Sequence, residues 1–210
     1  SEGEIQYENF NACKAEFEIR GFNVHPGEGK DTMINASLVA IEINNCLPSM
    51  ETPRGTEDYE GFYHLISMQG EVGEAKLNYI VRDHDKNGFE ERKKTLRLIE
   101  KNLNAKWGEG TVTLKITDQY LNMKEIVEEH MHLIDHAKKA CEAAGVAPLI
   151  LPIRGGTDGC QLSFKGLPCP NLGTGGHAYH GPYEHITVEG MDTAVEVTLQ
   201  IVKLFAERRD

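Results

Sequence analysis

Four segments within the first 120 positions have the alternating hydrophobic and polar pattern of strands. In the first, CKAEFEIR at 13–20, every second residue is apolar, so one face of the segment is hydrophobic. Further strands are predicted at 62–68, 75–83 and 111–117. Because each strand is short and bounded by Gly, Pro or Asp, we expect a sheet of several strands and not one long ribbon.

Two segments between these strands instead have apolar residues every three or four positions, which predicts helices at about 31–46 and 89–103. The order is therefore strand, helix, strand, strand, helix, strand. This is the split βαβ, or ferredoxin-like, βαββαβ pattern. It predicts a domain over residues 10–121.

The pattern changes after residue 121. Helices are predicted at 126–144, 158–164 and 189–208, and short strands at the apolar run PLILPI, 148–153, and at 167–172. This alternation is typical of an α/β sheet with parallel strands, so the fold class of the chain is α/β (α+β). Only two or three strands of such a sheet are present, and so small a sheet would leave apolar surface uncovered. We expect an incomplete α/β domain.

Composition narrows the classes of function. The chain has 210 residues and a net charge of −11, and its acid is spread over both halves without a basic stripe, which argues against nucleic acid as a partner. No apolar run approaches the ~20 residues of a membrane span. Five cysteines without a CxxC pair predict reduced thiols and a cytoplasmic protein. The first residues, Ser-Glu-Gly in place of Met, suggest a piece of a longer protein.

The stretch TGGHAYHGPYEH, 174–185, has the richest chemistry. It holds three histidines and a glutamate, and neutral imidazole is a common zinc ligand that a nearby carboxylate can orient. His180, four residues before Glu184, is the candidate ligand, and the alternative is a surface loop histidine. Zinc takes three or four protein ligands, so a complete site needs residues from elsewhere.

Three other residues are candidates for substrate binding or catalysis. Arg154, in IRGGTDG after an apolar strand, suits a carboxylate or phosphate, and the alternative is a surface arginine in a packing loop. His25, in NVHPGEGK, would reach toward a substrate, although spacing alone favours a capping or surface histidine. Arg82 ends a strand and would hold a substrate carboxylate, although spacing alone favours a salt bridge to the neighbouring acids.

These motifs together resemble one family. FNAC, NVHPGEGK, YEGFYHL, NYIVRD, PIRGGTDG, LSFKGLPCPNL and GGHAYHG, in this order, are similar to peptidase T, a family of bacterial aminotripeptidases with cocatalytic zinc. The resemblance covers nearly all 210 residues. It implies a zinc-binding α/β catalytic domain with an inserted ferredoxin-like lid or dimerisation domain. Residues 10–121 would be the lid, and residues 1–9 and 122–210 the C-terminal portion of the catalytic domain.

The resemblance assigns a role to each candidate residue. His180 matches the last zinc ligand of the family, and His25 matches the lid histidine that stabilises the oxyanion. Arg82 and Arg154 match arginines that hold the carboxylate end of the substrate. The remaining ligands of the family lie upstream of the lid, and no HxD motif is present in this chain.

The resemblance therefore implies a tripeptide substrate, two zinc ions per intact enzyme, and a homodimer formed through the lid. It also implies that this chain lacks the N-terminal half of its catalytic domain and is inactive alone. Two alternatives stay open. One is another peptidase or amidohydrolase of the same clan, and the other is a non-catalytic dimerisation module.

Overall fold

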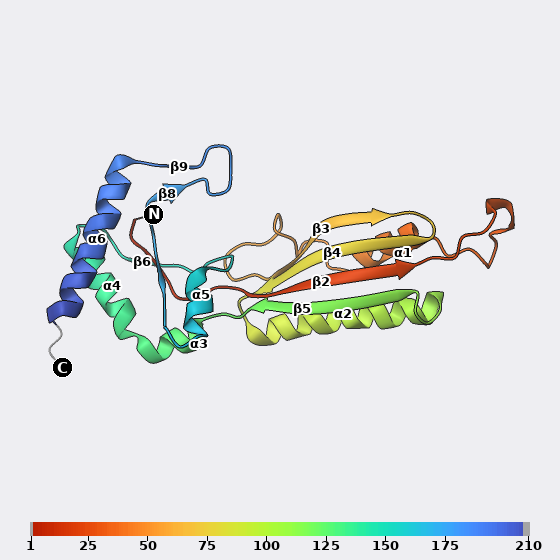
Figure 1. Cartoon of the computed structure of the whole chain (residues 1–210), viewed down its shortest axis with the longest axis horizontal. Coiled ribbons are helices and arrows are strands. Elements are labelled where there is room, and N and C mark those ends of the chain that lie inside the picture. Colours follow the sequence, from red (N-terminus) through yellow and green to blue (C-terminus); the bar gives the residue numbers. More distant parts are fainter. Residues whose placement is uncertain (1, 208–210) are drawn as a thin grey trace. The chain divides into compact units, whose positions relative to one another are not determined.

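The computed structural model describes residues 2–207, which divide into two compact units (Figure 1). We call Phe10–Leu121 the central unit, and Ser1–Asn9 together with Asn122–Asp210 the outer unit. The roles of lid and catalytic portion, which the sequence suggested for them, stay predictions.

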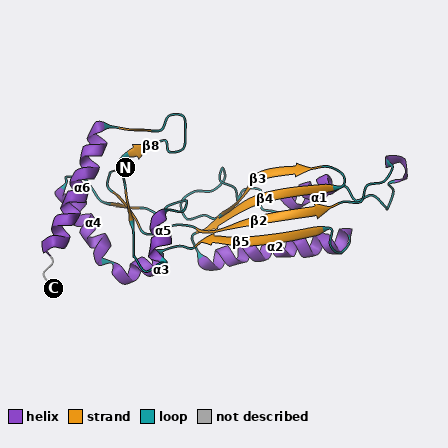
Figure 2. Cartoon of the chain, viewed as in Figure 1, coloured by secondary structure: helices purple, strands orange, loops and turns teal. Residues whose placement is uncertain are grey.

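The central unit has the strand and helix order that the sequence predicted, and the fold class is confirmed. Its elements are β2 (Asn11–Arg20), the 3₁₀ helix η1 (Pro26–Glu28), α1 (Ala36–Asn45), β3 (Phe62–Gly70), β4 (Glu74–Asp83), α2 (Lys86–Trp107) and β5 (Val112–Tyr120). The sheet has the order β3-β4-β2-β5 (Figure 2). Every neighbouring pair is antiparallel, as a split βαβ fold requires.

Alternation along β2 builds the core of the central unit. Cys13, Ala15, Phe17 and Ile19 are fully or almost fully buried, because every second side chain of a strand points to the same face. The helices α1 and α2 contribute apolar residues to the same cluster. The ring of Phe17 meets Tyr79 of β4 edge to face, with centroids 6.2 Å apart. The sheet and both helices therefore share one core.

The helices of the central unit begin at different residues from those predicted, because of their caps. The helix expected from residue 31 begins at Ala36, where the side chain of Asn35 accepts hydrogen bonds from two backbone N–H groups. Asp31 has φ of 55°, outside helical geometry. The helix expected at 89–103 is longer, because Asp85 caps it by accepting a 2.6 Å bond from the Gly88 N–H.

The outer unit is built from short elements. They are β1 (Glu4–Gln6), α3 (Lys124–Val127), the 3₁₀ helix η2 (Glu128–His130), α4 (His132–Ala143), β6 (Leu149–Ile150), α5 (Asp158–Ser163), β7 (Asn171–Leu172), β8 (Gly176–His177), β9 (His185–Ile186) and α6 (Val188–Glu207). Arg208, the last residue of the predicted final helix, lies outside the described residues. Helices α4 and α6 contact each other, with the rings of His136 and Phe205 4.5 Å apart.

The sheet of the outer unit differs from the parallel sheet that the sequence suggested. Its order is β6-β1-β7, with β6 parallel and β7 antiparallel to β1. The strand predicted at 167–172 is reduced to two residues, because Pro168 and Pro170 have no N–H to donate. The helix predicted at 126–144 is divided by η2, and nothing in the sequence pattern marks that division.

No helix within residues 2–207 combines the length and the apolar character that crossing a membrane would need. The longest apolar helix, α6, carries charged residues along one side.

Candidate functional site

His180 lies at the tip of a hairpin formed by β8 and β9 in the outer unit. Its side chain is exposed, and its backbone has φ of 61°, a left-handed conformation that is uncommon outside glycine. The His180 N–H donates a 3.0 Å hydrogen bond to a carboxylate oxygen of Glu184. Glu184 was expected to orient the imidazole ring, but it holds the backbone of the loop instead. It thereby fixes the direction of His180 indirectly.

The two strands of this hairpin are joined by a pair of histidines. His177 and His185 are register partners, and their rings stack with centroids 5.2 Å apart. The Tyr179 hydroxyl lies 3.2 Å from the Thr174 hydroxyl within the same loop. The histidine pair joins the two strands that flank His180, and the hydroxyl contact lies on the N-terminal side of His180. They supply a physical reason for the unusual density of histidine in this stretch.

The described residues do not fit a two-metal centre by themselves. Among residues 2–207, no group of three or more His, Cys, Asp and Glu side chains is placed to hold a metal ion. Glu184, the acidic side chain that bonds within the His180 loop, is engaged with a backbone N–H. A centre with two metals that included His180 would therefore need further ligands from other residues.

Arg154 begins the glycine-rich loop that leads into α5. The preceding residue, Ile153, forms a parallel bridge with Asn9 and donates a 2.8 Å bond to the Glu8 carbonyl. Arg154 is half-buried at this end of the short sheet. In the first turn of α5, a Cβ on Gly159 would lie 2.4 Å from the Cys169 carbonyl oxygen, so only glycine fits. Close packing fixes the loop, and with it the start of α5.

His25 caps the short helix η1 and is exposed in a loop of the central unit. Its Nδ1 accepts a 3.2 Å hydrogen bond from the Gly27 N–H. A neutral imidazole that accepts at Nδ1 carries its proton on Nε2, so the outer nitrogen is a hydrogen-bond donor. The capping position that spacing favoured is confirmed.

Arg82 is buried near the end of β4 and does not pair with the neighbouring acids among the described contacts. Its Nη1 donates to the backbone carbonyls of Val81 and Cys13, at 2.9 and 3.3 Å. Its guanidinium lies 5.3 Å from the ring centroid of Tyr120. Spacing favoured a salt bridge to the neighbouring acids, but Asp83 pairs with another arginine and Asp85 accepts a hydrogen bond from the Gly88 N–H.

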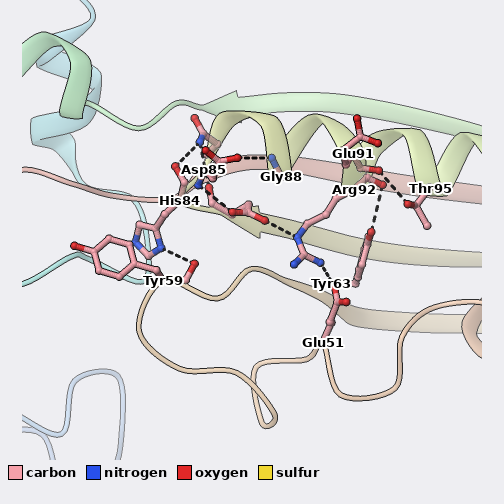
Figure 3. Close-up of polar contacts among 11 residues, drawn as sticks. Glu51, Tyr59, Tyr63, His84, Asp85, Gly88, Glu91, Arg92 and Thr95 are labelled. Atoms are coloured by element: carbon pink, nitrogen blue, oxygen red, sulfur yellow. Dashed lines mark hydrogen bonds and ion pairs between the residues drawn. The ribbon is translucent and has the colours of Figure 1, made fainter.

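That other arginine, Arg92, centres a polar cluster that the sequence pattern did not reveal (Figure 3). Its Nε donates a 2.8 Å bond to Asp83, its Nη1 pairs with Glu51, and it stacks on Tyr63 at 5.0 Å. Burial lowers the pKa of Arg92, but the hydrogen bonds to both carboxylates outweigh it and raise the pKa above its ordinary value. The cluster anchors the loop between α1 and β3 to the sheet.

His25 and Arg82 lie at opposite ends of the same sheet. Arg82 is the register partner of Ala12 near the start of β2, whereas His25 follows the end of β2 at Arg20. In Figure 1 the loop that contains His25 extends past the end of the sheet opposite to the end of β4. At about 3.3 Å per residue, the eight residues from Ala12 to Arg20 span about 26 Å.

Comparison with known proteins places these features in a family. The profile of the peptidase dimerisation domain matches residues 7–111, half of the chain. The chain belongs to the peptidase dimerisation domain family. The match covers the central unit from its first strand up to the start of β5.

Curated relatives are similar to this chain over almost the whole length of the chain. Peptidase T of Clostridium perfringens is 54% identical over 98% of the chain and 51% of its own length. Peptidase T of Caldanaerobacter subterraneus subsp. tengcongensis is 51% identical over 98% of the chain and 50% of its own length. The chain thus spans about half the length of the curated relatives it matches.

Solved structures share the fold at lower sequence identity. An aminopeptidase PepT from Bacillus cereus has a TM-score of 0.81 at 20% identity, over 98% of this chain and 54% of that one. A tripeptidase from Staphylococcus aureus has a TM-score of 0.84 at 17% identity, with the same coverage. A dinuclear metal binding peptidase of the M20 family from Bacillus subtilis has a TM-score of 0.68 at 15% identity, again with this coverage.

Proposed function

We propose that this chain is one part of a peptidase T-like aminopeptidase that releases the N-terminal residue of tripeptides. The observation that carries the proposal is the 50–54% identity to curated peptidase T proteins over 98% of the chain. The IRGGTDG and YHG motifs and the fold add support. The activity belongs to the intact protein, and the chain alone is inactive.

The four candidate residues take separate roles in this proposal. His180 would supply one ligand of a two-zinc centre, which in an intact enzyme activates a water molecule, and the remaining ligands come from the other part of the protein. Arg154 and Arg82 bind the substrate carboxylate. Support for the metal comes from the M20 relative that is described as a dinuclear metal binding peptidase.

His25 stabilises the oxyanion that develops on the scissile carbonyl. Its Nδ1 accepts the Gly27 N–H, so its Nε2 carries the proton that a developing negative oxygen requires. Capping also limits rotation of the ring, so the donor is held in place before the substrate binds. Loss of one such donor typically lowers kcat by about 10²–10³-fold.

The separation of His25 and Arg82 decides how they share a substrate. The stretch of β2 that separates them, from Ala12 to Arg20, is about 26 Å long, whereas an extended tripeptide is about 10 Å long. One copy of the central unit therefore does not offer both side chains to one tripeptide. We propose that the protein is a homodimer in which His25 acts in the site of the partner subunit. The match to a peptidase dimerisation domain supports this arrangement.

Mixing two inactive variants tests this proposal. The enzyme is reconstituted from this chain and the part of C. perfringens peptidase T that the chain does not match, and His25→Ala and Arg82→Ala chains are prepared separately. If His25 acts across the dimer, half of the dimers in a mixture are mixed and each has one intact site, which restores about a quarter of full activity. If both residues act within one copy, the mixture is as inactive as its components, and the proposal is wrong.

Simple assays distinguish two alternative functions from the proposed tripeptidase. Dipeptides and N-acyl amino acids test for another peptidase or amidohydrolase of the clan, since several hydrolases share the fold. The match to a dimerisation domain favours a second candidate for the isolated chain, a non-catalytic dimerisation module. Release of an N-terminal residue from a tripeptide by the pure chain would contradict the claim that it is inactive alone.

A further inference from the structure

Helix α6 is apolar on two opposite faces. One face, which includes the buried Gly190 and Val197, points toward the rest of the outer unit, where α4 contacts α6. The other face carries five exposed apolar residues, which we call the outer stripe: Val188, Met191, Val195, Leu199 and Val202. With 3.6 residues per turn, these five fall within an arc of about 80°. The outer stripe is therefore a continuous band along the helix.

The charged residues of α6 are confined to a narrow side between these two faces. They include Glu189, Asp192, Glu196 and Lys203. A helix with this distribution is typical of one that lies between two layers of structure, since a helix at the surface has one apolar face. The residues of the outer stripe are nevertheless 44–63% exposed. A second layer is missing from this side of α6 within the described residues.

Strand β6 points to the same conclusion. Leu149, Ile150 and Leu151 are consecutive, apolar and each more than a third exposed, a pattern typical of a strand inside a parallel sheet. The N–H groups of Leu149 and Leu151 donate to the carbonyls of Gly3, just before β1, and of Ile5, within β1. Because bonding directions alternate along a strand, the Ile150 N–H points to the opposite edge. Within residues 2–207, β6 pairs with β1 alone.

We propose that the outer stripe of α6 and the open edge of β6 are the docking surface for the remaining half of a peptidase T-like protein. This inference rests on the proposed function. The matched relatives contain about as much chain again as the part that this chain matches, which is enough to form the missing layer and the next strand. A second copy of this chain is disfavoured, because it would bring Glu189, Asp192 and Glu196 against acids of the same sign.

A binding titration tests the surface. The probe is the part of C. perfringens peptidase T that this chain does not match, produced as a separate polypeptide. Val195→Gln with Leu199→Gln should weaken binding at least tenfold. The matched control, Asp192→Gln with Lys203→Gln on the polar side of the same helix, should change it less than threefold. All four side chains are exposed in the chain alone, so circular dichroism should show equal helix content.

Hydrogen exchange gives a second readout at β6. Binding of the probe should slow exchange of the Ile150 amide, whereas the Leu149 and Leu151 amides are already bonded to the neighbouring strand. Equal binding by the stripe variant and its control would overturn the proposal, as would a probe that does not bind the chain at all. Unchanged exchange at Ile150 in the complex would remove β6 from the surface.

The two proposals fail separately. Stripe-dependent binding without hydrolysis of any tripeptide would count against the proposed function and leave the docking surface standing. Tripeptide hydrolysis by a mixture in which the stripe variant binds like the parent chain would support the function and overturn the docking surface.

Discussion

Replacing Arg92 of α2 by Met should destabilise the central unit. Arg92 bonds to Asp83 at 2.8 Å, pairs with Glu51 and stacks on Tyr63. Methionine keeps much of the apolar stem but removes the charge and every donor. Asp83 is then left as a mostly buried carboxylate that retains only the 2.9 Å bond from the Asp85 N–H among these contacts.

The size of the effect follows from exposure. The side chains of Arg92 and Asp83 are only 14% and 10% exposed, and removing one partner of a buried pair costs about 3–5 kcal/mol. Glu51 is 40% exposed, so its pair with Arg92 contributes less than about 1 kcal/mol. Because Asp83 keeps another donor, the lower end applies. We expect a loss of about 3 kcal/mol in the free energy of unfolding of the central unit.

Urea unfolding followed by tryptophan fluorescence measures this loss. Trp107 is the single tryptophan of the chain and lies in the central unit, where its Nε1 donates a 2.9 Å bond to Glu42. With an m-value of about 2 kcal/mol per molar urea, the midpoint should fall by about 1.5 M. Arg97→Met, at an exposed position of the same helix, is the control and should change stability by less than about 0.5 kcal/mol. A loss below about 1 kcal/mol for Arg92→Met, or an equal loss for both variants, would refute the reasoning.

Further predictions concern other single residues of the chain. Gly61→Ala places a Cβ 2.4 Å from the Asp83 carboxylate and 2.6 Å from Arg92 Nε, so it should cost about 2 kcal/mol in the same urea assay. Burial raises the pKa of Tyr79 to about 12. The folding stability linked to this shift is complete below pH 10 and is lost as pH rises toward 12. Tyr79→Phe should flatten that loss of stability in thermal melts at pH 9–12. Cys46 is exposed, whereas burial raises the pKa of Cys13 to about 12, so a thiol reagent at pH 8 should label Cys46 first and Cys13 only after unfolding. His25→Ala in the reconstituted enzyme should lower kcat by about 10²-fold with little change in KM, and an unchanged kcat would remove His25 from the reaction.

The sequence predicted the central unit well because its strands are amphipathic. Alternation along residues 13–20 decides which side chains are buried, and that information is local. The predicted starts of α1 and α2 were wrong because single capping residues, Asn35 and Asp85, decide where these helices begin. The strand β1 has three residues and is held by partners more than 140 positions away, so no local pattern marks it.

The sequence suggested candidate residues for a site but did not predict the contacts that their side chains make. Spacing favoured a capping or surface position for His25, and the structure adds that it is a cap and which ring nitrogen accepts. Spacing favoured a salt bridge between Arg82 and the neighbouring acids, but Asp83 bonds to Arg92, nine positions further on and on another element. The distance between His25 and Arg82 depends on the pairing of β2 with β4, which alternation alone does not specify.

The roles proposed for His180 and Arg154 are not visible in the contacts of the outer unit. His180 is held in direction by its left-handed backbone and by Glu184, but a single imidazole does not define a metal centre. The resemblance of the motifs to peptidase T was therefore the stronger guide to function, and local chemistry was the stronger guide to how each side chain is held.

The most direct test of the central claim is the rate at which an N-terminal residue is released from a tripeptide. The assay compares this chain alone, the complementary part of C. perfringens peptidase T alone, and their mixture, with a dipeptide and an N-acyl amino acid as competing substrates. We predict release from the tripeptide by the mixture, and none by either part alone. Hydrolysis by the chain alone, or a mixture that cleaves the competing substrates and not the tripeptide, would contradict the claim.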